Sequence, residues 1–275
     1  MALTDQSTRI REGEELDAAV IDQYLKAHIP GLAGEPRISQ FPGGASNLTY
    51  LLEYPNQEFV LRRPPFGHKA KSAHDMGREY RILNQLNAGF PYCPKAYVHC
   101  TDESVIGAEF YVMERVNGII LRSEMPAELN FSAEQTRELC KSFIDKMVEL
   151  HNVDYQACGL GDLGKPEGYV QRQIGGWSDR YDKALTPDAP LWEPVKAWLK
   201  DKMPADHHKP GIVHNDYRFD NVILSPQNPS QIIGVLDWEL TTIGDPLMDL
   251  GNTLAYWIEA GDSAPIQMMR RQPSN

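Results

Sequence analysis

The chain has only four cysteines in 275 residues, and no two of them form a Cys-x-x-Cys pair. This usage gives no sign of a disulfide framework, so a reducing cytoplasm is the simplest location. No uninterrupted apolar run approaches the ~20 residues that a membrane helix needs. The first residues also lack the basic-then-apolar order of a signal peptide. We therefore expect a cytoplasmic protein without a membrane partner.

Basic residues are in the minority, with 27 Lys and Arg against 38 Asp and Glu, which gives a net charge of −11. A surface this negative repels phosphate backbones, so we expect no nucleic-acid partner. An anionic small molecule would need a local basic patch or a metal ion. The hydrophobic share of 41% is that of an ordinary globular protein. A chain of this length forms one or two domains, or one domain of two lobes.

A change of pattern near residue 117 predicts the boundary between two parts of the chain. Before it, short apolar runs separated by Pro-Gly-Gly and Pro-Asn-Gln turns indicate an antiparallel sheet, accompanied by amphipathic helices. The elements expected in this part are helices over 13–28 and 73–88 and strands at 38–41, 48–54, 58–62 and 109–115.

The second part has a mostly helical pattern. Ser132 followed three residues later by Gln135 fits a capping box, and Asp245 before a proline fits a helix cap. We expect the three tryptophans of residues 177–198 to pack against helices and loops. Apolar residues after Ser132 recur at helical spacing and predict a buried stripe of Leu139, Phe143, Met147 and Leu150. Further elements are expected at 191–203, 212–213, 222–224, 232–236 and 247–259, whereas 159–190 receives no assignment.

The densest chemical signal is the run His-Asn-Asp-Tyr-Arg-Phe-Asp-Asn at residues 214–221, followed by a strand, a turn, another strand and Asp237. Asp216 and Asn221 lie five residues apart across a loop that can fold both side chains toward one site. A carboxylate there can accept a hydroxyl proton, and an amide oxygen with a second carboxylate can hold a cation such as magnesium. This combination is the equipment of phosphoryl transfer.

The same run resembles the kinase-like pattern H-x-D-x-x-x-x-N followed by a strand-borne Asp. With Val-Leu-Asp-Trp-Glu and Gly-Asp-Pro-Leu-Met-Asp-Leu-Gly downstream, the chain is similar to the aminoglycoside phosphotransferase and choline kinase-like family. Protein kinases instead have Asp-Phe-Gly where this chain has Asp-Trp-Glu. Within the family it is most similar to phosphotransferases related to the kinase-like domain of acyl-CoA dehydrogenase family members ten and eleven. The resemblance spans roughly residues 36–260.

The resemblance implies an α+β, two-lobed, protein-kinase-like fold. Residues 1–35 would be an N-terminal helical extension, 36–116 a nucleotide-binding lobe with an antiparallel sheet, and 117–275 a mainly helical catalytic lobe. Relatives usually carry several more helices after the position of Asp249, where this chain has 26 residues. We therefore expect a shortened second lobe and an exposed apolar face on the helix from Leu247.

The resemblance also assigns roles to the residues of the central run. Asp216 would be the catalytic base that faces the acceptor hydroxyl. Asn221 and Asp237 would bind magnesium that bridges the phosphates of ATP. His214 would support the catalytic loop, and Asp249 would hold the backbone of that loop from the following helix.

The nucleotide elements of the first lobe are less distinct. Gly43, Gly44, Ser46 and Asn47 lie between two expected strands and could cover phosphates with backbone N–H groups. A plain hairpin turn explains the two glycines equally well.

One arginine is expected where protein kinases use a lysine to pair with the nucleotide phosphates, because a guanidinium also binds phosphate. Adjacent strand residues face opposite sides, which leaves Arg62 and Arg63 as alternatives, and we favour Arg62. Glu79 would be its helix partner. Backbone groups of Glu114 and Val116 would contact adenine at the hinge between the lobes.

The sequence thus predicts an enzyme that uses ATP and magnesium to transfer the γ-phosphate to a hydroxyl of a small molecule. The alternative is a catalytically silent kinase-like nucleotide-binding module, which the missing lysine motivates. A metal-dependent hydrolase that works without ATP is disfavoured because no His-rich ligand set is present. An aminoglycoside and a hydroxylated acyl compound both stay open as acceptors, and the oligomeric state stays open as well.

Overall fold

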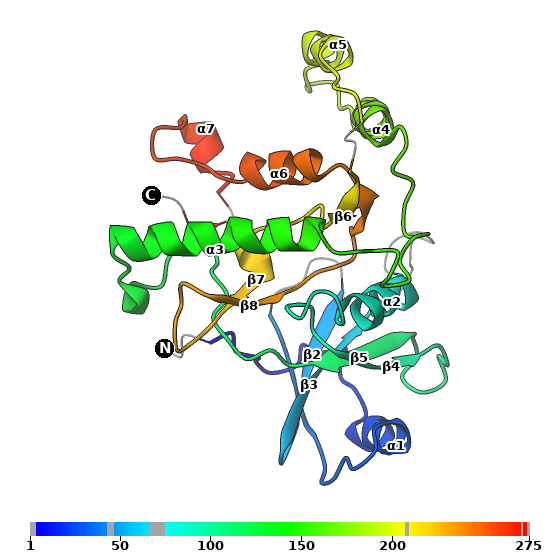
Figure 1. Ribbon diagram of the computed structural model, residues 1–275. Helices are drawn as coiled ribbons and strands as arrows, with labels where there is room; N and C mark the ends of the chain where they lie inside the picture. Colours follow the sequence, from blue (N-terminus) through cyan, green and yellow to red (C-terminus); the bar gives the residue numbers. More distant parts are fainter. Residues whose placement is uncertain (1–3, 43–46, 67–74, 207–208, 271, 274–275) are drawn as a thin grey trace.

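The computed structural model describes residues 4–42, 47–66, 75–206, 209–270 and 272–273. These residues form two lobes, one built on a sheet and the other mainly helical (Figure 1). The predicted two-lobed α+β architecture is therefore confirmed, with the sheet in the first half of the chain.

The first lobe is a five-stranded antiparallel sheet with the strand order β1-β2-β3-β5-β4. Thr8 forms an isolated antiparallel β-bridge with Gln40 at the outer edge of β1. Two helices accompany the sheet. The elements are α1 (Ala18–His28), β1 (Arg37–Gln40), β2 (Leu48–Tyr54), β3 (Gln57–Arg63), α2 (Met76–Leu86), β4 (Ala96–Cys100) and β5 (Phe110–Glu114).

Alternation along the strands divides this lobe into two apolar layers, because successive strand residues face opposite sides. Phe59 and Leu61, two residues apart on β3, face the same side and pack with α1. Val60 lies in the other layer, which contains α2 and continues into the second lobe. Arg62 therefore faces the second lobe. Arg63 faces the other way, and its guanidinium donates to the carbonyl of Ile106 at 3.0 Å.

The second lobe is built around the long helix α3, with the short strand pair β7–β8 beneath it in Figure 1 and the pair β6–β9 near its C-terminal end, next to α6. The predicted apolar stripe of α3 is fully buried. The elements are η1 (Ala127–Leu129), α3 (Ala133–His151), α4 (Tyr169–Ala184), α5 (Glu193–Asp201), β6 (Gly211–Val213), η2 (Phe219–Asn221), β7 (Val222–Leu224), β8 (Ile232–Val235), β9 (Thr242–Gly244), α6 (Pro246–Ala255) and α7 (Ala264–Gln267).

The start of α3 is the capping box that the sequence predicts. The Ser132 hydroxyl accepts from the Gln135 backbone N–H at 3.2 Å, and the Gln135 side chain accepts from the Ser132 N–H at 2.9 Å. Replacing Ser132 with Ala should lower the free energy of unfolding by about 1 kcal/mol, because it leaves a backbone donor without its cap. Chemical denaturation would measure the change. A Ser132→Asp variant, which keeps a capping oxygen, should stay near the parent, and equal stability of the Ala variant would contradict the cap's contribution.

The prediction that the tryptophans of residues 177–198 are packed is wrong. Trp177, Trp192 and Trp198 are 62%, 54% and 61% exposed. Trp177 lies on α4, Trp198 lies on α5 and Trp192 is the N-cap residue of α5. These two helices pack mainly against each other and project from the rest of the lobe (Figure 1). The expected exposed apolar face of α6 is present, with Leu247 64% and Leu254 47% exposed.

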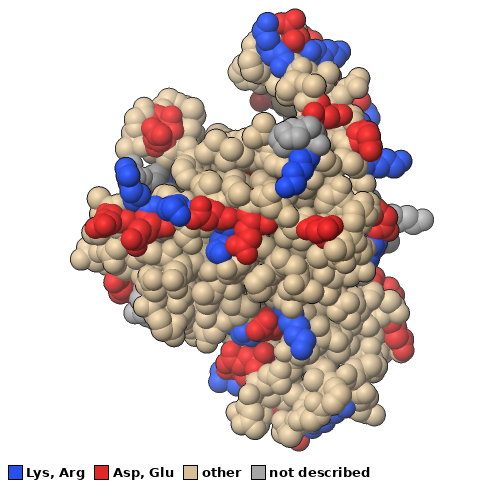
Figure 2. Space-filling model, viewed as in Figure 1, with Lys and Arg blue, Asp and Glu red and all other residues tan. Residues whose placement is uncertain are grey.

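The surface follows the acidic composition. Acidic side chains gather along the outer face of α3, which Figure 2 shows as a band of red across the second lobe. Among the described residues, no helix combines the length and the apolar character that crossing a membrane requires.

Candidate active site

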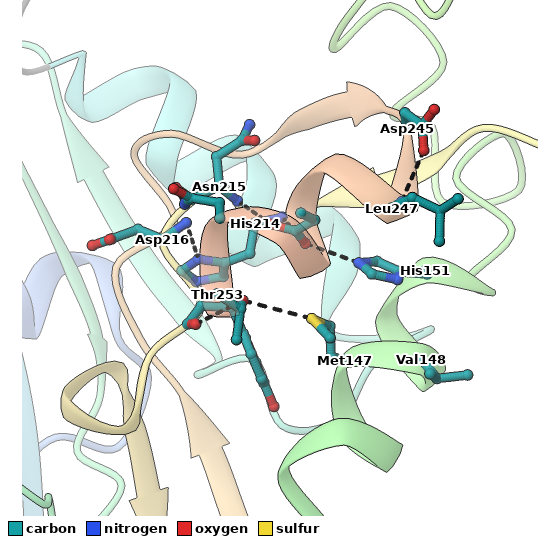
Figure 3. Close-up of polar contacts among 12 residues, drawn as sticks. Met147, Val148, His151, His214, Asn215, Asp216, Asp245, Leu247 and Thr253 are labelled. Carbon is teal, nitrogen blue, oxygen red and sulfur yellow. Dashed lines mark hydrogen bonds and ion pairs between the residues drawn. The ribbon is translucent and has the colours of Figure 1, made fainter. Parts of the chain in front are cut away.

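The loop after β6 is held by one buried carboxylate. Asp249 on α6 accepts from the backbone N–H of His214 at 2.9 Å and from that of Asn215 at 2.8 Å. His151 at the end of α3 lies 2.8 Å from the same carboxylate. Figure 3 shows His151 on one side of α6 and His214 on the other. Asn215 has a positive φ of 63°, a strained conformation that these bonds stabilise.

His214 supports the loop through its ring, as expected. The ring is completely buried, its Nε2 lies 2.9 Å from the Leu236 carbonyl, and its Nδ1 accepts from the Asp216 N–H at 3.2 Å. An imidazole with Nε2 protonated satisfies both contacts. His214 thereby connects the backbone of Asp216 to the residue that precedes Asp237.

Asp216 points away from this buried network, as Figure 3 shows. Its carboxylate accepts from the Asn221 side-chain amide at 2.8 Å, and the same amide donates to the Asp216 carbonyl at 2.9 Å. Both bonds use the amide nitrogen of Asn221, which leaves its oxygen as an acceptor. The five-residue loop thus brings the two side chains together in the way that the spacing predicts.

Arg218 is a site residue that was not predicted from the sequence. Its Nε lies 3.1 Å from one Asp216 oxygen and 3.3 Å from Asp220. Its guanidinium also lies over the ring of Tyr256, 4.8 Å from the centroid. Its position inside the 214–221 run, two residues after the carboxylate, was a signal that could have indicated it.

Asp237 lies two residues after the end of β8 and has a positive φ of 67°. Arg62 from β3 donates to its carboxylate at 3.3 Å and pairs with Glu79 on α2. Arg62 and Glu79 are both buried, whereas the Asp237 side chain is 32% exposed. Of the two arginines left open by the sequence, Arg62 is therefore the one that reaches the carboxylates between the lobes.

A cleft of about 150 Å³ lies between the lobes and collects most of these groups. Its polar walls include Arg62, Asn221 and Asp237, and its apolar walls include Met113 and Ile223. The predicted hinge residues Glu114 and Val116 also line it.

The glycine-rich turn is only partly described. Gly43, Gly44 and Ser46 lie outside the described residues. Asn47 is buried, and its side-chain amide donates to the Glu239 carboxylate at 3.2 Å. The end of this turn is therefore tied to the loop that follows Asp237.

The residues at the cleft fit a magnesium ion by their chemistry. The amide oxygen of Asn221 and the carboxylate of Asp237 are hard oxygen ligands that line the same space. Within the described part of the chain, no three His, Cys, Asp or Glu side chains are grouped to hold a metal. Magnesium accepts such a small protein ligand set because waters and substrate phosphates complete its octahedron.

Burial changes the acid–base behaviour of Glu79. Removal of its carboxyl from water raises its pKa to about 7 from a usual value of 4.5, although the nearby charge of Arg62 acts in the opposite direction. The folded protein therefore holds this proton more tightly than the unfolded chain.

A pH dependence of stability follows from Glu79. The contribution of Glu79 to the free energy of unfolding is fully present below about pH 4.5 and is lost as the pH rises toward 7, because the Glu79 carboxyl ionises in that window more readily in the unfolded chain than in the folded protein. The loss should be on the order of 3 kcal/mol. Urea unfolding at several pH values would measure it, with Glu79→Gln as the comparison. If the Gln variant shows the same slope as the parent, Glu79 is not the titrating group.

Two lobes joined at a hinge, with an Asp–Asn loop and a strand-borne Asp meeting an Arg–Glu pair across the cleft, define the kinase-like phosphotransferase fold. A family model described as "Phosphotransferase enzyme family" matches residues 37–274. The chain belongs to this family.

Curated relatives agree with this membership. Acyl-CoA dehydrogenase family member 11 of Gallus gallus is 34% identical over 262 residues, which cover 94% of this chain and 33% of the relative. The Homo sapiens protein of the same name is 35% identical over 248 residues, covering 88% of this chain and 31% of that protein. The chain thus spans about a third of the length of these relatives.

Solved structures show the same fold. A putative aminoglycoside phosphotransferase from Ralstonia eutropha JMP134 superposes with a TM-score of 0.76 and 36% identity, covering 88% of this chain and 70% of that chain. The streptomycin–ATP–APH(2")-IIa ternary complex superposes with a TM-score of 0.59 and 18% identity over 93% of this chain and 80% of that one. At that identity the second likeness concerns the fold alone.

Proposed function

We propose that this protein is a small-molecule kinase that transfers the γ-phosphate of ATP to a hydroxyl group with the help of magnesium. The observation that carries the proposal is the meeting of Asn221, Asp237 and Arg62 in one cleft, with Asp216 hydrogen-bonded to Asn221. The ATP-bound fold relative supports the choice of nucleotide.

Asp216 acts on the acceptor in this mechanism. Its carboxylate orients the hydroxyl and receives the proton as the oxygen bonds to the γ-phosphorus, while the bond from that phosphorus to the β-phosphate oxygen breaks and ADP leaves. Arg218 lies against the Asp216 carboxylate, so it restricts the carboxylate's orientation.

Arg62 binds the phosphates and stays fixed because Glu79 holds its guanidinium. Magnesium, held by the Asn221 amide oxygen and the Asp237 carboxylate, would neutralise charge on the phosphates when bound. The backbone at Glu114 and Val116 borders the cleft where an adenine would contact the hinge.

The proposal is tested by incubating the protein with ATP, magnesium and a panel of hydroxylated small molecules that includes aminoglycosides and hydroxylated acyl compounds. We expect acceptor-dependent ADP formation and a product heavier by one phosphoryl group. Nucleotide binding without turnover across the panel would favour the silent binding module. Product release without ATP would favour a hydrolase.

A further inference from the structure

The loop of residues 237–241, which we call the metal-side loop, has a strained backbone at Asp237. Asp237 has a φ of 67°, in the left-handed region that a residue with a Cβ adopts only at a cost. Such a conformation persists when contacts on both sides hold the chain. The direction of the Asp237 carboxylate therefore depends on how the residues before and after it are fixed.

The upstream side is held from within the second lobe. The Leu236 N–H donates to the Asn221 carbonyl at 2.8 Å, and the Leu236 carbonyl lies 2.9 Å from the His214 ring nitrogen. The indole of Trp238 donates to the Val235 carbonyl at 2.9 Å. All these partners belong to the same lobe as Asp237.

The downstream side is held from both lobes. In the second lobe, the Asn215 side-chain amide donates to the Leu240 carbonyl at 3.0 Å. Arg78 on α2 donates to the Glu239 carbonyl at 2.9 Å through one terminal nitrogen and to the Thr241 carbonyl through the other. A guanidinium suits this task because its planar fork presents two donors at once. Thr241 is completely buried, so its carbonyl depends on a protein partner.

Arg78 precedes Glu79, the residue that holds Arg62 against Asp237. Two neighbouring residues of α2 thus fix the loop at different points: Glu79 acts through the Arg62 side chain, and Arg78 acts through backbone carbonyls. Both sets of contacts join the first lobe to the segment that carries Asp237.

We infer that Arg78 is a positioning residue for the metal site: it fixes the backbone after Asp237 and so directs this carboxylate toward the cation. The inference rests on the proposed function, because it assumes that Asp237 binds the magnesium of a nucleotide. It adds a dependence of metal affinity on the position of α2, a helix that contributes no metal ligand of its own.

Arg81 provides a matched control on the same helix. It also reaches the second lobe, with its guanidinium 3.0 Å from the Asp162 carboxylate and 3.0 Å from the Gly159 carbonyl. Its partners lie in the loop after α3, separate from the residues that follow Asp237. Loss of either arginine removes one contact between the lobes, but only Arg78 contacts the metal-side loop.

The experiment titrates Mn²⁺ into the ADP-bound full chain and follows the signal of free Mn²⁺ by electron paramagnetic resonance. Replacing Arg78 with Gln should raise the Mn²⁺ concentration at half-saturation by about 10-fold or more, as losses in the outer shell of a metal site do. Arg78→Lys, which keeps the charge and part of the donation, should lie between Gln and the parent. Arg81→Gln should stay within about 2-fold of the parent. ADP affinity measured without metal should change little in all three variants.

Hydrogen exchange of the metal-free protein gives a second readout. Arg78→Gln should speed the exchange of the amides at residues 236–241, whereas Arg81→Gln should not. Equal weakening of Mn²⁺ uptake by both Gln variants would overturn the inference, because it would indicate general loosening of the lobes. Parental uptake by Arg78→Gln would overturn it as well. If the parent protein itself takes up no Mn²⁺ with ADP, the proposed function fails first and this inference fails with it.

Discussion

Replacing Asp216 with Asn should reduce phosphoryl transfer to an accepted hydroxyl substrate by about 10³-fold while leaving the affinity for ATP and magnesium within about 3-fold. Asparagine has nearly the same shape and keeps an oxygen that can accept from Asn221, as the carboxylate does at 2.8 Å. It cannot accept the hydroxyl proton. The loss should therefore appear in kcat and leave nucleotide binding largely unchanged.

The measurement combines steady-state turnover on an acceptor found by the panel with calorimetric titration of the nucleotide. Arg218→Gln is the informative companion, because its side chain contacts Asp216 at 3.1 Å but cannot replace it as a base. We expect a smaller loss of turnover there. An Asp216→Asn protein that turns over at the parental rate would contradict the assignment of the base.

Asp249→Asn should lower the free energy of unfolding by about 3 kcal/mol and also suppress turnover. The carboxylate is fully buried and accepts from two backbone N–H groups and the His151 ring. In the amide, one oxygen becomes an NH₂ group that faces donors in place of accepting from them. The loop that carries Asp216 then loses its anchor.

Asp245→Asn is the matched control one turn earlier on α6. Asp245 caps that helix by accepting from the Leu247 N–H at 2.8 Å, and asparagine caps a helix about as well as aspartate. Denaturant unfolding should therefore separate the two variants by more than about 2 kcal/mol. Equal stabilities would show that the Asp249 charge does not hold the loop.

The free energy of unfolding at low pH offers a further test of the role of Asp249. Burial alone raises the pKa of this carboxyl, but the hydrogen bond and charge of His151, together with smaller contributions from the charge and backbone N–H of His214, outweigh it, so the pKa lies below its usual range. The stabilisation is therefore present above the unfolded pKa and is lost as the pH falls through the folded pKa. Below about pH 4 the parent should lose its advantage over Asp249→Asn.

The sequence predicted the elements whose pattern is strong and local. The stripe from Leu139 to Leu150 and the cap at Ser132 are confirmed because helical spacing and a reciprocal cap are properties of a few neighbouring residues. The strand β4 was not predicted, because its two strand-forming residues, Tyr97 and Val98, are adjacent and make too short a run to indicate a strand. Its position is fixed by pairing with β5.

In the candidate site, too, local contacts could be predicted from the sequence and long-range contacts could not. The contact between Asp216 and Asn221 follows from their spacing in one loop. The choice of Arg62 over Arg63 needed the faces of the sheet, which depend on packing against α1 and α2. The contacts of Arg78 with carbonyls more than 160 residues away could not be anticipated, because backbone acceptors leave no trace in a sequence.

We propose that Asn221, Asp237 and Arg62 form one metal–nucleotide site. This site can be tested by calorimetric titration of a non-hydrolysable ATP analogue, with magnesium and then with a chelator. Magnesium should tighten binding by about 10-fold or more in the parent, and Asp237→Asn should remove this difference. Binding that is indifferent to magnesium in the parent, or no binding at all, would contradict it.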